Sequence, residues 1–169
     1  MRWVASASSL ISRTTARSFS GSADFAPGTA AAPLTSLGGA DLFVARYDGA
    51  GALLSVLSIG GAGATIHPGG LAFDDGGNLL LDGSFLGSVD FDAGTTTRIL
   101  ASIAPASGTD VFTARYTPGG GLLWVSRFGD GSAAGGANAA TAVAPDGSGG
   151  ALVAGRFFAS PDFDPGASS

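Results

Sequence analysis

The sequence of 169 residues contains no cysteine, no lysine, no glutamate and no glutamine. Without cysteine, the chain can form neither disulfide bonds nor thiolate metal sites. Without lysine, it cannot contain a phosphate-binding loop that ends in Gly-Lys. Lys, Glu and Gln are strong helix formers on protein surfaces, so their absence argues against a helical protein.

Charge is scarce and one-sided. All eight basic residues are Arg, all thirteen acidic residues are Asp, and the net charge is −5. An acidic chain has no long-range attraction to a phosphate backbone, so we expect no nucleic-acid partner. Residues 49–73 lack Asp and Arg and are numerous enough to cross a bilayer. Many glycines interrupt this stretch and its later copy carries Arg127, so we expect no membrane span.

Glycine is abundant instead, with 29 residues, and the mean hydropathy is +0.36. Glycine and proline together stay below the level that marks low-complexity disorder. The chain is long enough for one hydrophobic core. These properties favour an all-β protein made of short strands and turns.

An internal repeat dominates the sequence. Asp41–Tyr47 recurs as Asp110–Tyr116, and Gly60 and Gly129 follow the two aspartates at the same spacing. Residues 74–85 match residues 146–157. The element Asp-Phe-Asp-x-Gly begins at Asp90 and Asp162, and a related Asp-Phe-Ala-Pro-Gly begins at Asp24. We therefore divide the chain into an irregular or truncated N-terminal segment (1–18), a first repeat (19–94) and a second repeat (95–169).

Each repeat predicts four short antiparallel strands. In the first repeat, Leu42–Tyr47 alternates with period two, a glycine-rich turn follows, and Leu53–Ile59 returns. Gly70–Phe73 and Leu79–Phe85 form a second hairpin around a turn whose glycines tolerate positive φ. Four such strands are typical of one β-propeller blade. We expect about two four-stranded blades plus partial ends, as a fragment of a larger propeller.

The order of these motifs over residues 19–169 resembles the bacterial β-propeller repeat family of large secreted or surface proteins. The subtype with an inserted Asp-Phe-Asp-Pro-Gly element is the most similar. The resemblance implies an extracellular or cell-surface location and a non-enzymatic binding or scaffold role. It also implies partners, namely other blades of the same or neighbouring chains, and a protein or carbohydrate ligand.

Two alternatives to this function stay open. The chain is also consistent with a fragment of a propeller enzyme that acts on polysaccharide, whose catalytic residues lie outside it. A truncated, non-functional reading frame is the other alternative, because the N-terminal segment is ragged. Further near-identical blades in flanking sequence would favour the scaffold, whereas a cluster of His, Glu or Lys would favour the enzyme.

Paired aspartates are the candidate metal ligands. Alternate carboxylates before a tight turn can supply oxygen ligands to Ca²⁺, and the candidates are Asp90, Asp92, Asp162 and Asp164. The favoured interpretation is an Asx turn, in which the Asp oxygens accept backbone N–H groups. We therefore expect no cofactor and assign no metal site to these residues.

No catalytic constellation is found. The only histidine, His67, precedes Pro68 in a glycine-rich stretch that predicts a loop, and the sequence has no Gly-x-Ser-x-Gly elbow. Arg46 and Arg115 occupy equivalent strand positions. They predict either a surface for acidic or sugar ligands or pairing with Asp on a neighbouring strand.

Phenylalanines recur at equivalent positions, as packing between repeats requires. We expect the core to contain Phe25, Phe43, Phe85, Phe91, Phe112, Phe157 and Phe163.

Overall fold

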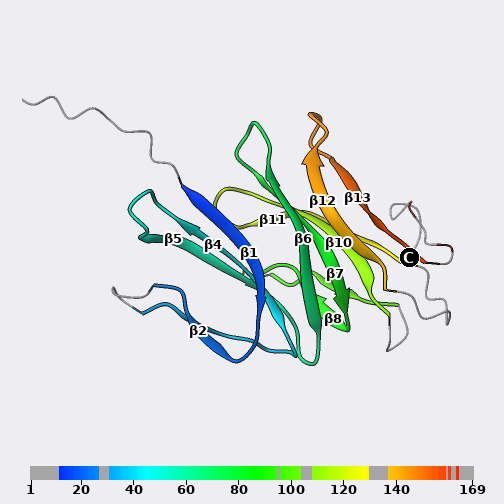
Figure 1. The fold of residues 1–169 in the computed structure, drawn as a ribbon, viewed down its shortest axis with the longest axis horizontal. Coiled ribbons are helices and arrows are strands. Elements are labelled where there is room, and N and C mark those ends of the chain that lie inside the picture. Colours follow the sequence, from blue (N-terminus) through cyan, green and yellow to red (C-terminus); the bar gives the residue numbers. More distant parts are fainter. Residues whose placement is uncertain are drawn as a thin grey trace, which may run out of the picture.

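The computed structural model describes residues 12–26, 31–94, 96–103, 108–129, 137–158, 160 and 163. Within these residues the chain forms strands and no helix, so the all-β prediction is confirmed. The strands form several small antiparallel sheets, and none of these sheets closes on itself (Figure 1). Because the described part is free of helices, it offers no helical membrane span.

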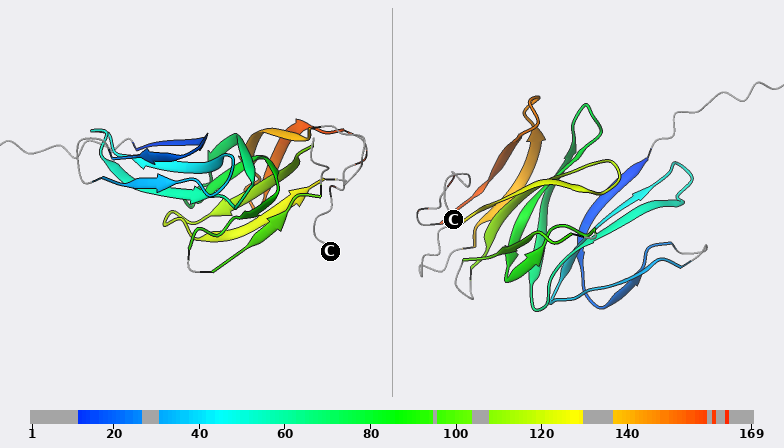
Figure 2. Two further views of the ribbon diagram at one scale, coloured as in Figure 1. Left: turned by 90° about the horizontal axis from the view of Figure 1, so that it is seen from below. Right: turned by 180° about the vertical axis from the view of Figure 1, so that it is seen from behind.

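Three larger sheets follow one another along the chain. The first sheet contains β1 (Arg13–Phe19), β4 (Asp41–Tyr47) and β5 (Leu53–Ile59) in the order β1-β4-β5. The central sheet has the order β11-β10-β7-β6, with β6 (Thr65–Phe73), β7 (Leu79–Leu86), β10 (Asp110–Tyr116) and β11 (Leu122–Phe128). The C-terminal sheet pairs β12 (Ala139–Pro145) with β13 (Ala151–Arg156). Both views of Figure 2 show the central sheet between the other two.

The sheets are out of phase with the sequence repeat. The two hairpins of the first repeat were expected in one blade, but β4–β5 and β6–β7 lie in different sheets. β7 pairs instead with β10 of the second repeat, and Phe112 lies opposite Gly83. An added Cβ at Gly83 would come within 2.8 Å of the Phe112 ring, so the glycine makes room for this side chain. Side-chain packing therefore selects the more distant partner along the chain.

Only the central sheet has all four strand types within the described residues. Phe19 of β1 matches Phe85 of β7 in the repeat, so the first sheet contains the counterparts of β7, β10 and β11. Phe157, directly after β13, also matches Phe85, so the C-terminal sheet contains the counterparts of β6 and β7. The outer edge of β13 therefore corresponds to the edge of β7 that pairs with β10 in the central sheet.

Small hairpins are inserted where the chain passes from one repeat to the next. They are β2 (Ser22–Asp24) with β3 (Pro33–Thr35), and β8 (Ser88–Asp90) with β9 (Ile99–Ala101). The second hairpin is also bonded to the first sheet, since Asp90 N–H donates to the Gly60 carbonyl at 2.9 Å. Each insertion thus carries the Asp-Phe element over the core.

Three rings meet beneath the β8–β9 hairpin. Phe91 lies 5.6 Å from Phe85 and 4.9 Å from Phe112, measured between ring centroids, and all three side chains are fully buried. The Tyr116 hydroxyl donates to the Phe91 carbonyl at 2.9 Å. This aromatic cluster is the centre of the hydrophobic core.

The first sheet repeats this arrangement. Phe25 lies 5.8 Å from Phe19 and 4.5 Å from Phe43, and the Tyr47 hydroxyl donates to the Phe25 carbonyl at 3.0 Å. The C-terminal sheet has only two of the three rings, Phe157 and Phe163, at 5.2 Å. Their predicted burial is wrong, because they are 55% and 62% exposed at an edge that no β10-type strand covers among the described residues.

The connections from the central sheet to the other two larger sheets, and the connection between β7 and β10, all lie at one end of this sheet. Thr65 is paired with Leu86, and Phe85 is paired with Asp110. Phe128, at the end of β11, is paired with Val111. The chain therefore enters at β6 and leaves at β11 on opposite edges of the sheet but at the same end.

A buried aspartate closes this end of the first sheet and of the central sheet. Asp41 is buried against Gly60, where an added Cβ would lie 2.2 Å from the Asp41 carboxyl carbon. Its Oδ2 accepts the Leu37 N–H at 2.7 Å, and Asp110 Oδ2 accepts the Ile103 N–H at the same distance. This packing explains why a glycine follows each of these aspartates at the same spacing.

Candidate functional site

The inserted hairpins hold the candidate calcium ligands. Asp90 Oδ1 accepts the N–H groups of Asp92 at 3.0 Å and Arg98 at 2.8 Å. Asp92 accepts the Gly94 N–H at 3.0 Å and the Thr96 hydroxyl. Asp24 accepts two backbone N–H groups in the same way. These contacts are those of an Asx turn, which uses the carboxylate oxygens within the loop.

The acidity of these groups follows from their hydrogen bonds. Donors from Thr96 and Gly94 lower the pKa of Asp92, and the N–H groups of Ala26 and Ala32 lower the pKa of Asp24. In the described part of the chain, no three His, Asp, Glu or Cys side chains gather as a metal site would require. The other two candidates, Asp162 and Asp164, lie outside the described residues.

Arg115 joins the central and C-terminal sheets. Its Nε donates to Asp74 Oδ2 at 3.0 Å, its Nη2 contacts the same oxygen, and its Nη1 donates to the Gly149 carbonyl at 2.9 Å. Hydrogen bonds from the Asn78 side chain and backbone, together with Arg115, lower the pKa of Asp74 to about 2. The expected pairing of a strand Arg with a neighbouring Asp is confirmed here.

Arg46 occupies the equivalent position of the first sheet, in different surroundings. Its Nε is buried and makes no hydrogen bond among the residues that the structure describes. The side chain borders a groove of about 400 Å³ between the first and central sheets. The repeat thus places the same side chain in two different environments.

A buried polar pair interrupts the core of the central sheet. Asp82 on β7 lies opposite Thr113 on β10, and both side chains are buried. Asp82 Oδ1 accepts the Gly70 N–H, whereas Asp82 Oδ2 and Thr113 Oγ1 have no hydrogen-bond partner among the described residues. In the first sheet, Ala16 and Val44 form the corresponding pair. Sequence reasoning missed this pair, although a position-by-position comparison of the repeats contains the signal.

One edge of β13 pairs with no strand in the described part of the chain, and it borders an apolar groove of about 220 Å³. Its walls include Val111 and Phe128 from the central sheet, together with Gly155, Phe157 and Phe163. Leu152, on β13, is 64% exposed. Sequence reasoning did not find this groove, because its position depends on which strands pair.

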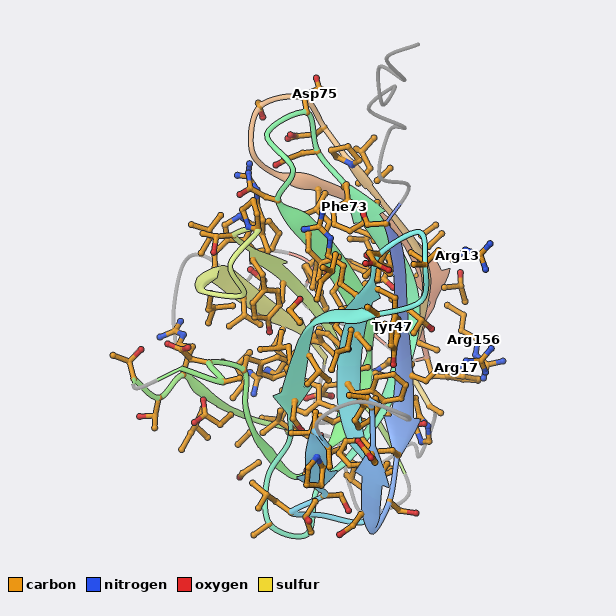
Figure 3. All side chains as sticks on the ribbon, turned by 90° about the vertical axis from the view of Figure 1, so that its left-hand side faces the viewer. Arg13, Arg17, Tyr47, Phe73, Asp75 and Arg156 are labelled. Atoms are coloured by element: carbon orange, nitrogen blue, oxygen red, sulfur yellow. The ribbon has the colours of Figure 1, made fainter. Side chains whose placement is uncertain are left out.

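Three exposed side chains, Arg13, Arg17 and His67, border none of these grooves, whereas the exposed Arg156 borders the groove beside β13. His67, expected in a loop, instead lies on β6, which continues across a bulge between Pro68 and Leu71. Arg13 and Arg17 of β1 project to the same side as Arg156 of β13 (Figure 3). Their exposure distinguishes the three arginines from Arg46 and Arg115.

A scan of family models and a search of curated proteins both found no match to this chain. The resemblance to a β-propeller repeat family therefore stays a prediction that rests on the motifs. Function must be argued from the sheets and grooves themselves.

Proposed function

We propose that the chain is a non-enzymatic β-propeller-type repeat module of a secreted or cell-surface protein. In this proposal it is a scaffold that joins further repeats edge to edge. The observation that carries the proposal is the edge of β13 that no described strand covers, with its apolar groove. The location rests on the motif resemblance alone.

The central sheet shows which kind of strand pairs with such an edge. β10 covers β7 there and places Phe112 opposite Gly83, beside the rings of Phe85 and Phe91. On β13 the counterpart of Gly83 is Gly155. An added Cβ at either glycine would lie 2.3 Å from a carbonyl oxygen of the preceding strand. At the edge of β13 that no described strand covers, Gly155 therefore leaves the same space for the side chain of an incoming phenylalanine.

The register of the incoming strand follows from the same equivalence. A strand reading Asp-x-Phe-x-Ala-Arg-Tyr would place its Phe over Gly155, against Phe157 and Phe163. Its Arg would lie opposite Leu152, near the Asp146 carboxylate, as Arg115 lies near Asp74. Its Tyr hydroxyl would donate to the Phe163 carbonyl, as Tyr116 does to Phe91.

An uncovered edge with exposed apolar side chains is also a site of self-association. In the C-terminal sheet these side chains are Leu152, Val153, Phe157, Phe158 and Phe163. Burying one large apolar side chain contributes about 1.5–3 kcal/mol. A cognate hairpin that covers several of them has enough apolar surface to bind in trans.

The test measures the solution mass of the full chain by light scattering on a sizing column. A synthetic hairpin of residues 110–128 is added, and the same peptide with Phe112→Ala is the control. We expect a one-to-one complex with the first peptide and at least about tenfold weaker binding of the second. The Phe157→Ala variant, which removes an exposed ring at this edge, should weaken the complex while keeping its far-ultraviolet circular dichroism.

Equal binding of both peptides, or no binding of either, would refute the edge as a repeat acceptor. Polydisperse aggregate that the hairpin does not change would favour the truncated reading frame. A discrete oligomer of the chain alone, dispersed by the hairpin, would show that copies complete one another's sheets.

A further inference from the structure

A second groove lies between the first and central sheets, and we call it the inter-sheet groove. It is bordered by Arg46, Ser55 and Leu57 from the first sheet and by Phe73, Gly77 and Pro118 from the central sheet. Its volume of about 400 Å³ is within the range of small-ligand sites, which is roughly 300–1,000 Å³. The lining combines one cation, apolar side chains and glycine backbone.

Arg46 is the unusual group in this groove. Its Nε is shielded from solvent and unpartnered among the described residues. A guanidinium cannot lose its charge at ordinary pH, so it gains most from an acceptor where water is excluded. The groove thus contains a cation for which the described part of the chain supplies no anion at Nε.

The repeat shows what this side chain binds. Arg115, at the equivalent position, uses Nε and Nη2 on the Asp74 carboxylate and Nη1 on the Gly149 carbonyl. Because residues 74–85 match residues 146–157, the counterpart of Gly149 is Gly77, which borders the inter-sheet groove. The glycine that supplies this carbonyl to Arg115 therefore has a counterpart at the same groove as Arg46.

The carboxylate is what the first sheet lacks. Asp74 lies in the turn that precedes β7, and the corresponding segment is the one that precedes β1. The first acidic residue of the sequence is Asp24, so no carboxylate side chain precedes β1 in this sequence. This segment therefore supplies Arg46 with no carboxylate of the kind that Asp74 supplies to Arg115.

We propose that the inter-sheet groove binds a carboxylate group through Arg46. The guanidinium would engage the two carboxylate oxygens, as planar Arg does with such groups. The remainder of the ligand would lie against Leu57 and Pro118. This site goes beyond the scaffold function and does not depend on the edge of β13.

Two sources can supply this chemistry, a small organic acid or an acidic turn of another repeat. The test uses nuclear magnetic resonance titration of the full chain with propionate, with galacturonate and with a peptide of residues 71–81. That peptide contains the turn whose Asp74 binds Arg115. Propionamide is the uncharged control for the small acids. The peptide with Asp74→Asn, which keeps Asp75, is the matched control that lacks only the carboxylate that binds Arg115.

Arg46→Gln should weaken binding of every carboxylate probe at least about tenfold, and Arg46→Lys should restore only part of it. Arg17→Gln, an exposed arginine on β1, should bind like the wild type (Figure 3). Circular dichroism establishes that each variant is folded. Binding of the small acids identifies a small ligand, and binding of the peptide alone identifies an acidic turn. Failure of all probes, or equal binding to Arg46→Gln, would overturn the proposal.

Discussion

Replacing Asp82 with Asn should stabilise this protein at high pH and leave its stability nearly unchanged near pH 4. Asp82 is fully buried, and only its Oδ1 has a partner among the described residues, the Gly70 N–H. Burial raises the pKa of Asp82, and the Gly70 hydrogen bond offsets only part of this shift. The folded protein therefore holds this proton at pH values where the unfolded chain has released it.

The sign of the pH effect follows from this difference. The contribution of Asp82 to stability is largest below its unfolded pKa of about 3.9 and falls as pH rises through the raised folded pKa. An asparagine side chain at this position would keep the acceptor for Gly70 and could not ionise. A buried polar group without a partner costs about 1–3 kcal/mol, which sets the expected gain of Asp82→Asn at pH 8. Near pH 4 the difference should be under about 0.5 kcal/mol.

Urea unfolding of both proteins at pH 4, 6 and 8 measures this difference. Asp75→Asn is the matched control, because Asp75 is exposed in the β6–β7 turn and should have little effect at any pH (Figure 3). A difference between Asp82→Asn and the wild type that does not change with pH would refute the argument. So would destabilisation at pH 8, because it would mean that the carboxylate has a stabilising partner.

Other consequences can be tested with the same unfolding assay. Phe91→Ala should lower the free energy of unfolding by about 3–5 kcal/mol, whereas Phe163→Ala should lower it by less than about 1 kcal/mol, because only the first ring is buried. Similar losses would contradict the packing. Stability should fall as pH drops from about 4 toward 2, because the pKa of Asp74 is lowered to about 2 and protonation removes its hydrogen bonds; a stability constant over this range would disagree. Saturating Ca²⁺ should leave the unfolding midpoint unchanged, because Asp90 and Asp92 accept N–H groups within their own loop; a higher midpoint would restore these residues as ligands.

Several strand positions could be predicted from the sequence, but the start of β6 and the partners of the strands could not. Leu53–Ile59 was predicted with its observed bounds, and the repeated Asp-x-Phe segments both form strands. Local alternation and glycine turns determine such elements. The pairing of β7 with β10 brings Phe112 over Gly83, a contact between residues far apart in sequence. Proximity along the chain favoured the other pairing.

Some features of the candidate sites could likewise be predicted from the sequence, and others could not. The turn role of Asp90 and the ion pair of Arg115 followed from residue type and spacing, because both depend on local geometry or on a repeated strand position. The unpartnered Nε of Arg46 could not be predicted, because it reflects a contact that the described part of the first sheet lacks. Asp82 was detectable in principle, since alanine stands at both equivalent positions, Ala16 and Ala154.

The position of the chain connections determines how the central sheet would respond to mechanical force. The chain enters at Thr65 and leaves at Phe128, on opposite edges but at the same end of the sheet. Tension between these points would pull across the strands and load the hydrogen bonds one after another. A tether of such modules would extend by unzipping at low force, and each opened sheet would release roughly 200 Å of chain at about 3.3–3.6 Å per residue.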